Sequence, residues 1–202
     1  MKVDTCRTTF AVLCVVLFSG CALFSPVKTD TKQYALKDIP LDLPNERTHS
    51  STLLVLVPET ETLYATTQMA YSNRAYQVAY FSQNEWVETP SQMIQPLIVE
   101  TFRQTHYFSE VLPSPDFSPH TFVLRSEILD LKQDFTSEPA MLQLTMRFYL
   151  TREATNQVIA TEELSVREPM RERNPYAGVV AANEAMTKLL RELARFVVDE
   201  AN

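Results

Sequence analysis

The sequence predicts an α+β fold: a single domain in which a mostly antiparallel sheet with a long β-hairpin carries two main helices packed on it. Residues 142–150 alternate between apolar and polar side chains, which is typical of a strand with one buried face. Residues 175–199 carry apolar side chains at helical spacing, which predicts a long helix with one buried stripe. A capping motif at residues 89–92 predicts the start of the other helix.

The first strands of the predicted domain follow an N-terminal lead. Residues 22–50 are rich in proline and polar side chains and predict a tether, with a short edge strand at residues 34–36. The apolar run at residues 53–57 predicts a strand that is buried on both faces. Residues 76–80 alternate and predict another strand, after which we expect a turn at Asn84.

The first predicted helix starts after Thr89. Thr89 can cap the helix, Pro90 suits its first position, and Gln92 completes a capping box. Pro96 lacks a backbone donor, so we expect a kink or an irregular first turn there. A short strand is then expected at residues 107–112.

The long hairpin follows a long strand over residues 121–135. The apolar residues of that strand change parity, which predicts a bulge near residues 126–128. The hairpin itself comprises the strand at residues 142–150, a loop at residues 153–156 and a returning strand at residues 158–166. The helix at residues 175–199 then closes the predicted domain.

A lipoprotein signal lies at the N-terminus. Residues 10–18 are apolar but too short to span a bilayer, and Lys2 and Arg7 precede them, as in a secretory signal peptide. Ser19 and Gly20 are small, as a signal peptidase requires, and the thiol of Cys21 can be alkylated to carry diacylglycerol. The motif resembles the lipobox of bacterial lipoproteins. An uncleaved N-terminal anchor is the alternative.

The lipobox and the pattern of elements predict three parts of the chain: a signal peptide at residues 1–20, a lipidated N-terminus and tether at residues 21–50, and a periplasmic α/β domain at residues 51–202. Acyl chains such as palmitate on Cys21 would be the membrane link, and no cofactor is expected. By resemblance to other lipoproteins, Ala22 rather than Asp after the cysteine predicts an outer-membrane protein that faces the periplasm.

The charge of the chain argues against a nucleic-acid partner. The full sequence has a net charge of −7, and removal of Lys2, Arg7 and Asp4 with the signal peptide makes it −8. Nucleic-acid binding requires a basic stripe, which an acidic chain of this kind is not expected to offer.

The composition also argues against an enzyme. The chain has two glycines, Gly20 and Gly178, so phosphate-binding loops, dinucleotide fingerprints and nucleophile elbows cannot form in their usual way. His49, His106 and His120 are far apart in the sequence, and none has a partner at metal-ligand spacing. We therefore expect no catalytic residue and no metal site.

A distinctive pattern lies between residues 71 and 97. Arg74 precedes the tyrosine-rich segment of Tyr76 and Tyr80, Trp86 follows, and Pro90 opens a helix. This pattern and the order of the surrounding elements resemble the ABC-type transport auxiliary lipoprotein family of PqiC-like proteins. The family usually has small residues between Trp and Pro, so this chain departs from its pattern there.

The resemblance implies a function. It implies a non-enzymatic accessory of an ABC transport system whose periplasmic component carries MCE domains and which moves lipids or other hydrophobic molecules between membranes. It also implies an MCE-domain protein as partner and a homo-oligomer. The first alternative hypothesis is a lipoprotein that assembles envelope structures or binds cell-wall enzymes, and the second is an envelope hydrolase.

The residues of the pattern leave two questions open. Trp86, Tyr76 and Tyr80 can form either a core cluster under the first helix or an aromatic ligand-binding surface. Arg74 can pair with a carboxylate inside the fold or present its guanidinium group to a partner.

Overall fold

The computed structural model describes residues 30–44 and 48–202. Thr31–Asn202 form one compact unit, and we refer to it as the folded unit. It begins before residue 51, where the sequence predicted the domain to start. The predicted signal peptide and Cys21 lie outside the described residues.

The sheet is built around the long strand β7 (Phe122–Asp134). On one side β7 pairs with β8 (Met141–Arg152), and β8 pairs with β9 (Gln157–Pro169), both in antiparallel orientation. On its other side β7 pairs in parallel with three short strands, which are β2 (His49–Val55), β3 (Glu59–Thr60) and β4 (Gln68–Ser72).

Three further strands join the sheet through β2 and β4. β6 (Phe108–Pro113) pairs in parallel with β2. β5 (Ala79–Trp86) pairs in antiparallel orientation with β4, and β1 (Lys32–Tyr34) pairs in parallel with β5. The predicted α+β class is confirmed: the long ladders are antiparallel, and several short parallel ones make the sheet mixed.

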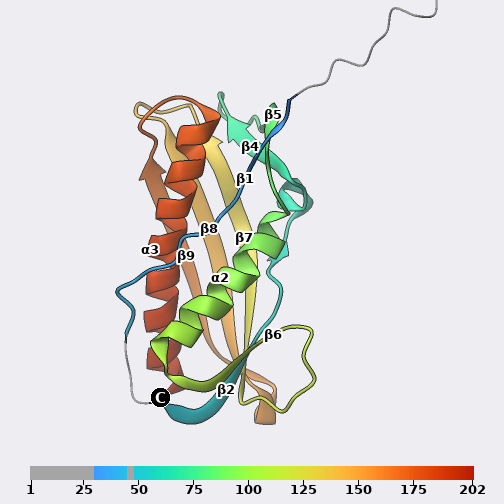
Figure 1. Cartoon of the computed structure of the whole chain (residues 1–202), viewed down its shortest axis with the longest axis vertical. Helices are drawn as coiled ribbons and strands as arrows, with labels where there is room; N and C mark the ends of the chain where they lie inside the picture. Colours follow the sequence, from blue (N-terminus) through green and yellow to red (C-terminus); the bar gives the residue numbers. More distant parts are fainter. Residues whose placement is uncertain (1–29, 45–47) are drawn as a thin grey trace, which may run out of the picture. The chain divides into compact units, whose positions relative to one another are not determined.

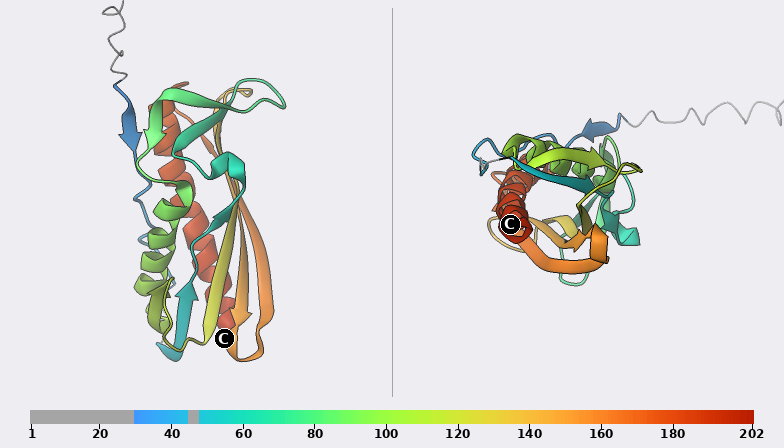
Figure 2. Two further views of the ribbon diagram at one scale, coloured as in Figure 1. Left: turned by 90° about the vertical axis from the view of Figure 1, so that its right-hand side faces the viewer. Right: turned by 90° about the horizontal axis from the view of Figure 1, so that it is seen from below.

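Two helices, α2 (Pro90–Thr105) and α3 (Pro175–Ala201), lie side by side against the curled sheet (Figure 1; Figure 2). α2 packs on β2 and β6, whereas α3 packs on β8 and β9. The buried apolar side chains of sheet and helices form one continuous core. Neither helix of the folded unit is long and apolar enough to cross a membrane.

The two helix starts are capped by side chains. The backbone N–H of Thr89 donates to Oε1 of Gln92 at 3.2 Å, as the predicted capping box requires. α2 continues as a helix through Pro96. Asn174 caps α3, because its Oδ1 accepts a hydrogen bond of 2.8 Å from the backbone N–H of Ala177.

The β8–β9 hairpin confirms the alternating pattern. Leu144, Met146, Phe148 and Leu150 are fully buried, while the residues between them are half-buried. A 3₁₀ turn at Glu153–Thr155 joins the two strands. In β7 the register shifts between Ile128 and Asp130, next to the predicted bulge.

Two local predictions are wrong. Residues 76–78 do not belong to a strand, because residues 73–78 form an exposed turn between β4 and β5. Asn84 lies within β5 and pairs with Lys32, so the expected turn is also absent there.

The described part of the lead, residues 31–44, packs on the fold instead of extending away from it. Leu36 is 5% exposed and belongs to the core. Nδ2 of Asn183 on α3 donates to the carbonyl of Ala35 at 3.2 Å, and its Oδ1 accepts from the backbone N–H of Lys37 at 2.8 Å. Farther along the lead, Arg191 pairs with Asp42 at 2.6 Å. These contacts fix the path of the lead along α3.

Candidate functional site

The structure separates the five residues of the pattern between residues 74 and 90. Arg74 and Tyr76 lie in the exposed turn of residues 73–78, which we call the β4–β5 turn. Trp86 is 4% exposed in the core, and Pro90 is the first residue of α2. Tyr80 is partly buried, and its hydroxyl donates to the carbonyl of Leu63 at 3.0 Å.

The two open questions now have different answers for different residues. Trp86 packs in the core, as the interpretation of a cluster under the first helix requires. The side chain of Tyr76 is fully exposed, so it does not belong to that cluster. Among the described residues, no carboxylate pairs with Arg74, which leaves its guanidinium group free for a partner.

Backbone contacts hold the β4–β5 turn in shape. Tyr76 has a φ of 63°, in the left-handed region that non-glycine residues rarely adopt. The backbone N–H of Gln77 donates to the carbonyl of Arg74 at 3.2 Å, and the hydroxyl of Ser72 donates to the carbonyl of Gln77. These bonds close the turn and direct Tyr76 away from the sheet.

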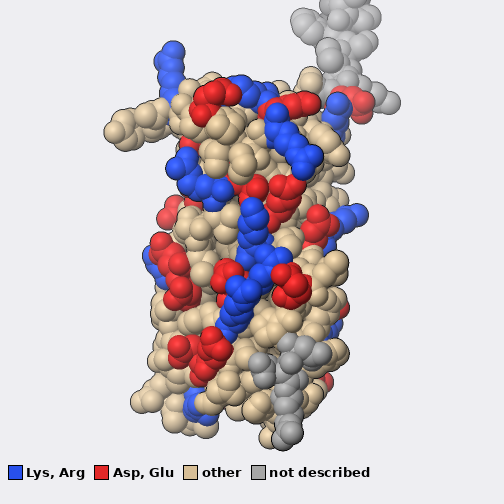
Figure 3. All heavy atoms as spheres, turned by 90° about the vertical axis from the view of Figure 1, so that its left-hand side faces the viewer, with Lys and Arg blue, Asp and Glu red and all other residues tan. Residues whose placement is uncertain are grey.

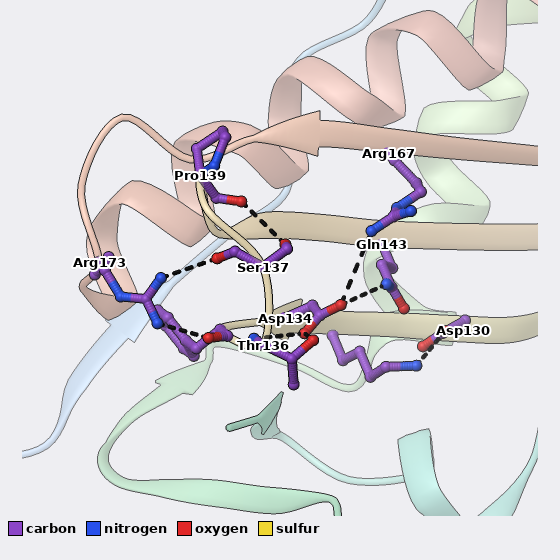
Figure 4. Close-up of polar contacts among 10 residues, drawn as sticks. Asp130, Asp134, Thr136, Ser137, Pro139, Gln143, Arg167 and Arg173 are labelled. Carbon is purple, nitrogen blue, oxygen red and sulfur yellow. Dashed lines mark hydrogen bonds and ion pairs between the residues drawn. The ribbon is translucent and has the colours of Figure 1, made fainter. Parts of the chain in front are cut away.

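Asp134 organises the floor beside this turn (Figure 4). It ends β7 directly opposite Ser72 of β4. Its carboxylate accepts hydrogen bonds from the backbone N–H of Thr136 at 2.9 Å, from the Thr136 hydroxyl at 2.6 Å and from Nε2 of Gln143 at 2.9 Å. Arg167 of β9 lies 4.0 Å from it.

These contacts keep Asp134 ionised although it is only 7% exposed. Burial raises the pKa of a carboxyl group, because it disfavours the charged form. The hydrogen bonds from Thr136 and the positive charges of Arg167 and Lys132 outweigh burial, so the pKa of Asp134 lies below its usual value. The floor of the site is therefore a fixed negative charge surrounded by donors.

Arg173 ties the β7–β8 connection to the segment before α3 (Figure 4). Its guanidinium group donates to the carbonyls of Phe135 at 2.6 Å and Ser137 at 3.0 Å, and it pairs with Glu138 at 3.2 Å. It also lies over the ring of Phe135, 5.5 Å from the centroid. The Phe135 ring in turn packs edge-on against Tyr71 and Phe81, which stack on each other.

The β4–β5 turn and this floor enclose a hollow of about 280 Å³. Its walls include Arg74 and Tyr76 from the turn and Lys132, Asp134 and Thr136 from the sheet side. Ala75 and Val78 also line the hollow, so it offers apolar surface as well as charged groups.

The described residues contain no group of three or more His, Cys, Asp or Glu side chains that could hold a metal ion. The three histidines lie apart from one another: His49 stacks on Tyr107, His106 ends α2 with a left-handed backbone, and His120 lies 3.5 Å from Glu153.

The sequence did not indicate Asp134, Phe135 or Arg173 as members of this site. Asp134 and Arg173 are far apart in the chain, and only the pairing of β7, β8 and β9 brings them to one end of the sheet. The only local hint that Arg173 belongs to the site is that it directly precedes Asn174, the residue that caps α3.

Charges on the face that carries α3 are mixed in sign. Figure 3 shows Lys and Arg side chains among Asp and Glu side chains over this face. Lys188 pairs with Glu168 of β9, and Arg195 pairs with Glu192 within the helix at 2.8 Å. Local pairing of this kind does not create a field that would attract a highly charged partner.

Comparison with known families identifies the chain. Residues 34–194 match the family model described as the ABC-type transport auxiliary lipoprotein component. The chain belongs to this family. Membership makes it an auxiliary lipoprotein component of ABC-type transport, as the pattern between Arg74 and Pro90 predicted. No curated protein matches the sequence.

Solved structures similar to this auxiliary lipoprotein share its fold. Protein XCC0632 from Xanthomonas campestris, of the family DUF330, is 16% identical with a TM-score of 0.76, and the match covers 84% of this chain and 96% of that one. The hypothetical protein CT253 from Chlamydia trachomatis is 13% identical with a TM-score of 0.51, and the match covers 76% and 100%. At these identities the likeness shows the fold alone.

Proposed function

We propose that this auxiliary lipoprotein is anchored in the outer membrane through acyl chains on Cys21, faces the periplasm, and acts as a non-enzymatic accessory of an MCE-type ABC transport system. In that system it would help to move lipids or other hydrophobic molecules between membranes. The match of residues 34–194 to the auxiliary family carries the proposal. The lipobox at Cys21 adds the anchor.

The interior of the folded unit supports an accessory role over that of a lipid carrier. Its buried apolar side chains pack into one continuous core. The hollow beside the β4–β5 turn has a volume of about 280 Å³ and charged walls, including Lys132 and Asp134. Because the interior is filled by its own side chains, we propose that cargo is held by the partner and not inside this domain.

The N-terminus of the mature protein tests the anchor. We expect mass spectrometry of the protein purified from its native envelope to show Cys21 as the first residue, with acyl chains attached. Density-gradient separation of the two membranes should place the protein in the outer-membrane fraction. An intact residue 1 or an unacylated Cys21 would overturn the anchor, and an inner-membrane location would overturn the sorting.

Co-purification tests the partner. The tagged full-length chain, extracted in mild detergent, should recover an MCE-domain protein or another component of an ABC transporter. A matched control is the same tag on an unrelated outer-membrane lipoprotein from the same cells. Recovery of cell-wall enzymes or envelope-assembly proteins alone would favour the alternative function instead.

Native mass measurement tests the proposed homo-oligomer. The chain of 202 residues has a mass of 23.1 kDa before processing, so an assembly is easily distinguished from a single copy. We expect the detergent-extracted protein to have a mass that is two or more times the mass of the mature chain. A single copy over the whole accessible concentration range would contradict this part of the proposal.

A further inference from the structure

The β4–β5 turn is the most exposed apolar feature at its end of the folded unit. Tyr76 has a relative exposure of 108%, and Val78 is 40% exposed. The turn contains Arg74 but no acidic residue. Arg74 has no carboxylate partner among the described residues.

Further exposed aromatic and basic side chains lie at the same end. The first turn of α3 is at this end of the unit, as both side views show (Figure 1; Figure 2). Tyr176 in that turn is 62% exposed, and Arg171 just before it has a side chain that is 85% exposed and lies 3.8 Å from the carboxylate of Glu184. Tyrosine and arginine together are typical of surfaces that lie at the headgroup level of a bilayer, because each combines an apolar body with a polar tip.

The chain enters the folded unit at this end as well. The start of β1 lies at the same end of the unit as the β4–β5 turn and the first turn of α3 (Figure 1; Figure 2), where Lys32 pairs with Asn84 of β5. Nine residues, 22–30, separate Cys21 from Thr31 in the sequence, which makes ten steps from one Cα atom to the next. Even fully extended, a segment of that length spans at most about 35 Å.

The opposite end of the unit is too far away to rest on the same membrane. α3 has 27 residues and runs from one end to the other, which corresponds to about 40 Å at 1.5 Å per residue. A connection of at most about 35 Å cannot run back over that length and still place Cys21 at a membrane beneath the far end. The short connection therefore favours the end with Tyr76 as the one nearer the lipid anchor.

We propose that the β4–β5 turn contacts the membrane that holds the lipid of Cys21, with Tyr76 and Val78 in the headgroup region and Arg74 on a lipid phosphate. The proposal rests on the proposed function, because the anchor at Cys21 brings the turn to a membrane. The structure assigns one occupant to this surface, the phospholipid headgroup layer.

The lipid anchor on Cys21 makes such a small contact effective. The mature chain carries a net negative charge, so it has no general attraction to anionic lipid. A single turn buries little area, and on its own it would bind weakly. Because the lipid on Cys21 already holds the domain at the surface, the contact is intramolecular and experiences a millimolar effective concentration, so it orients the domain and does not need to recruit it.

A fluorescent probe on the turn tests this orientation. Cys6 and Cys14 lie in the predicted signal peptide and Cys21 would be alkylated, so a Tyr76→Cys chain has one free thiol for a nitrobenzoxadiazole label. The labelled full-length protein is reconstituted into vesicles of phosphatidylethanolamine with a minority of phosphatidylglycerol. Vesicles that also contain lipids with a spin label close to the headgroup should quench this probe.

Phe117 provides the matched control. It is 98% exposed, like Tyr76, but lies in the loop between β6 and β7 at the opposite end of the unit (Figure 1). We expect a probe at Phe117→Cys to be quenched several-fold less than the probe at Tyr76→Cys. A probe at Val78→Cys should follow Tyr76, which guards against a local effect of one substitution.

The outcomes distinguish this inference from the proposed function. Equal quenching at both ends, or stronger quenching at Phe117, would overturn the inference while an acylated Cys21 leaves the anchor intact. A change in the fluorescence of the probe at Tyr76→Cys that appears only after an ABC-transport partner is added would also overturn it. That result would indicate that the turn binds a protein. An unacylated Cys21 in mass spectra of the same sample would overturn both.

Discussion

Replacement of Gly178 by alanine should destabilise the folded unit, although alanine is the better helix former. Gly178 lies in the first turn of α3, and a Cβ atom there would be 2.0 Å from Cδ of Gln133. Gln133 on β7 is 2% exposed, and its Nε2 donates to the carbonyl of Pro175 at 3.1 Å. Because the amide of Gln133 is enclosed, it cannot swing into solvent to make room.

The size of the effect follows from three contributions. Extra volume in a packed site costs about 1–3 kcal/mol, and loss of the hydrogen bond from Gln133 costs about 1 kcal/mol more. Alanine regains about 1 kcal/mol over glycine through its helix propensity. The balance is a loss of about 2 kcal/mol in the free energy of unfolding, which lowers Tm by about 4–8 °C for a unit of this size.

A double-mutant cycle with Gln133 is the sharpest assay. Unfolding in urea is followed by circular dichroism for the native chain, Gly178→Ala, Gln133→Ala and the double variant. With the Gln133 amide removed, Gly178→Ala should be neutral or stabilising by up to about 1 kcal/mol. An equal cost of Gly178→Ala in both backgrounds would refute the reasoning, as would a single variant that is more stable than the native chain.

Three further predictions concern the lead, the cap of α3 and the floor of the site. Leu36→Ala should lower the free energy of unfolding in urea by about 2–3 kcal/mol, because Leu36 is in the core, whereas Leu41→Ala at a 93% exposed position should change it by less than about 0.5 kcal/mol. Asn174→Ala should cost about 1 kcal/mol in the same assay through loss of the cap, and Asn174→Asp should restore most of it; equal losses would exclude capping. The lowered pKa of Asp134 means that its ionised form stabilises the fold above the unfolded pKa of about 4, and that this stabilisation is lost as pH falls through the lower folded pKa. Asp134→Asn should therefore be less stable than the native chain at neutral pH, with a difference that shrinks between about pH 5 and pH 2; a constant difference would contradict the charge-based explanation.

The clearest signals in the sequence came from elements that bury one face alone. Alternation in residues 142–150 and the apolar stripe of residues 175–199 each reflect a local period matched to one buried face. The parallel strands gave weaker signals, because β3 and β4 are short and their pairing with β7 joins residues far apart in the chain. No local pattern specifies such a pairing.

The error at residues 76–78 has a physical cause. Tyr76, Val78 and Tyr80 alternate with other residues and suggest a strand. However, the hydroxyl of Ser72 and the carbonyl of Arg74 each bond to Gln77 and close a turn there. Tyr76 then adopts a left-handed backbone and points to solvent. A side-chain bond to a backbone carbonyl five residues away competes with strand pairing, and the alternation of side chains does not reveal it.

The candidate site was predicted only in part for a similar reason. The sequence identified Arg74 and Tyr76, which project from a local turn. Asp134 and Arg173 come from separate strands and loops, and each looks like an ordinary surface charge until the sheet is assembled. Their roles depend on hydrogen bonds to backbone carbonyls and amides, whose positions only the tertiary structure defines.

The path of the lead changes how far the domain can reach from its anchor. The sequence predicted a tether over residues 21–50. Leu36 in the core and the pairing of Asp42 with Arg191 instead hold residues 31–44 along α3, which leaves about ten residues between Cys21 and the fold. If Cys21 carries the lipid anchor, as we propose, a connection of at most about 35 Å would keep the domain beside the membrane that holds the lipid. A transport partner anchored in another membrane would then have to bridge the remaining distance.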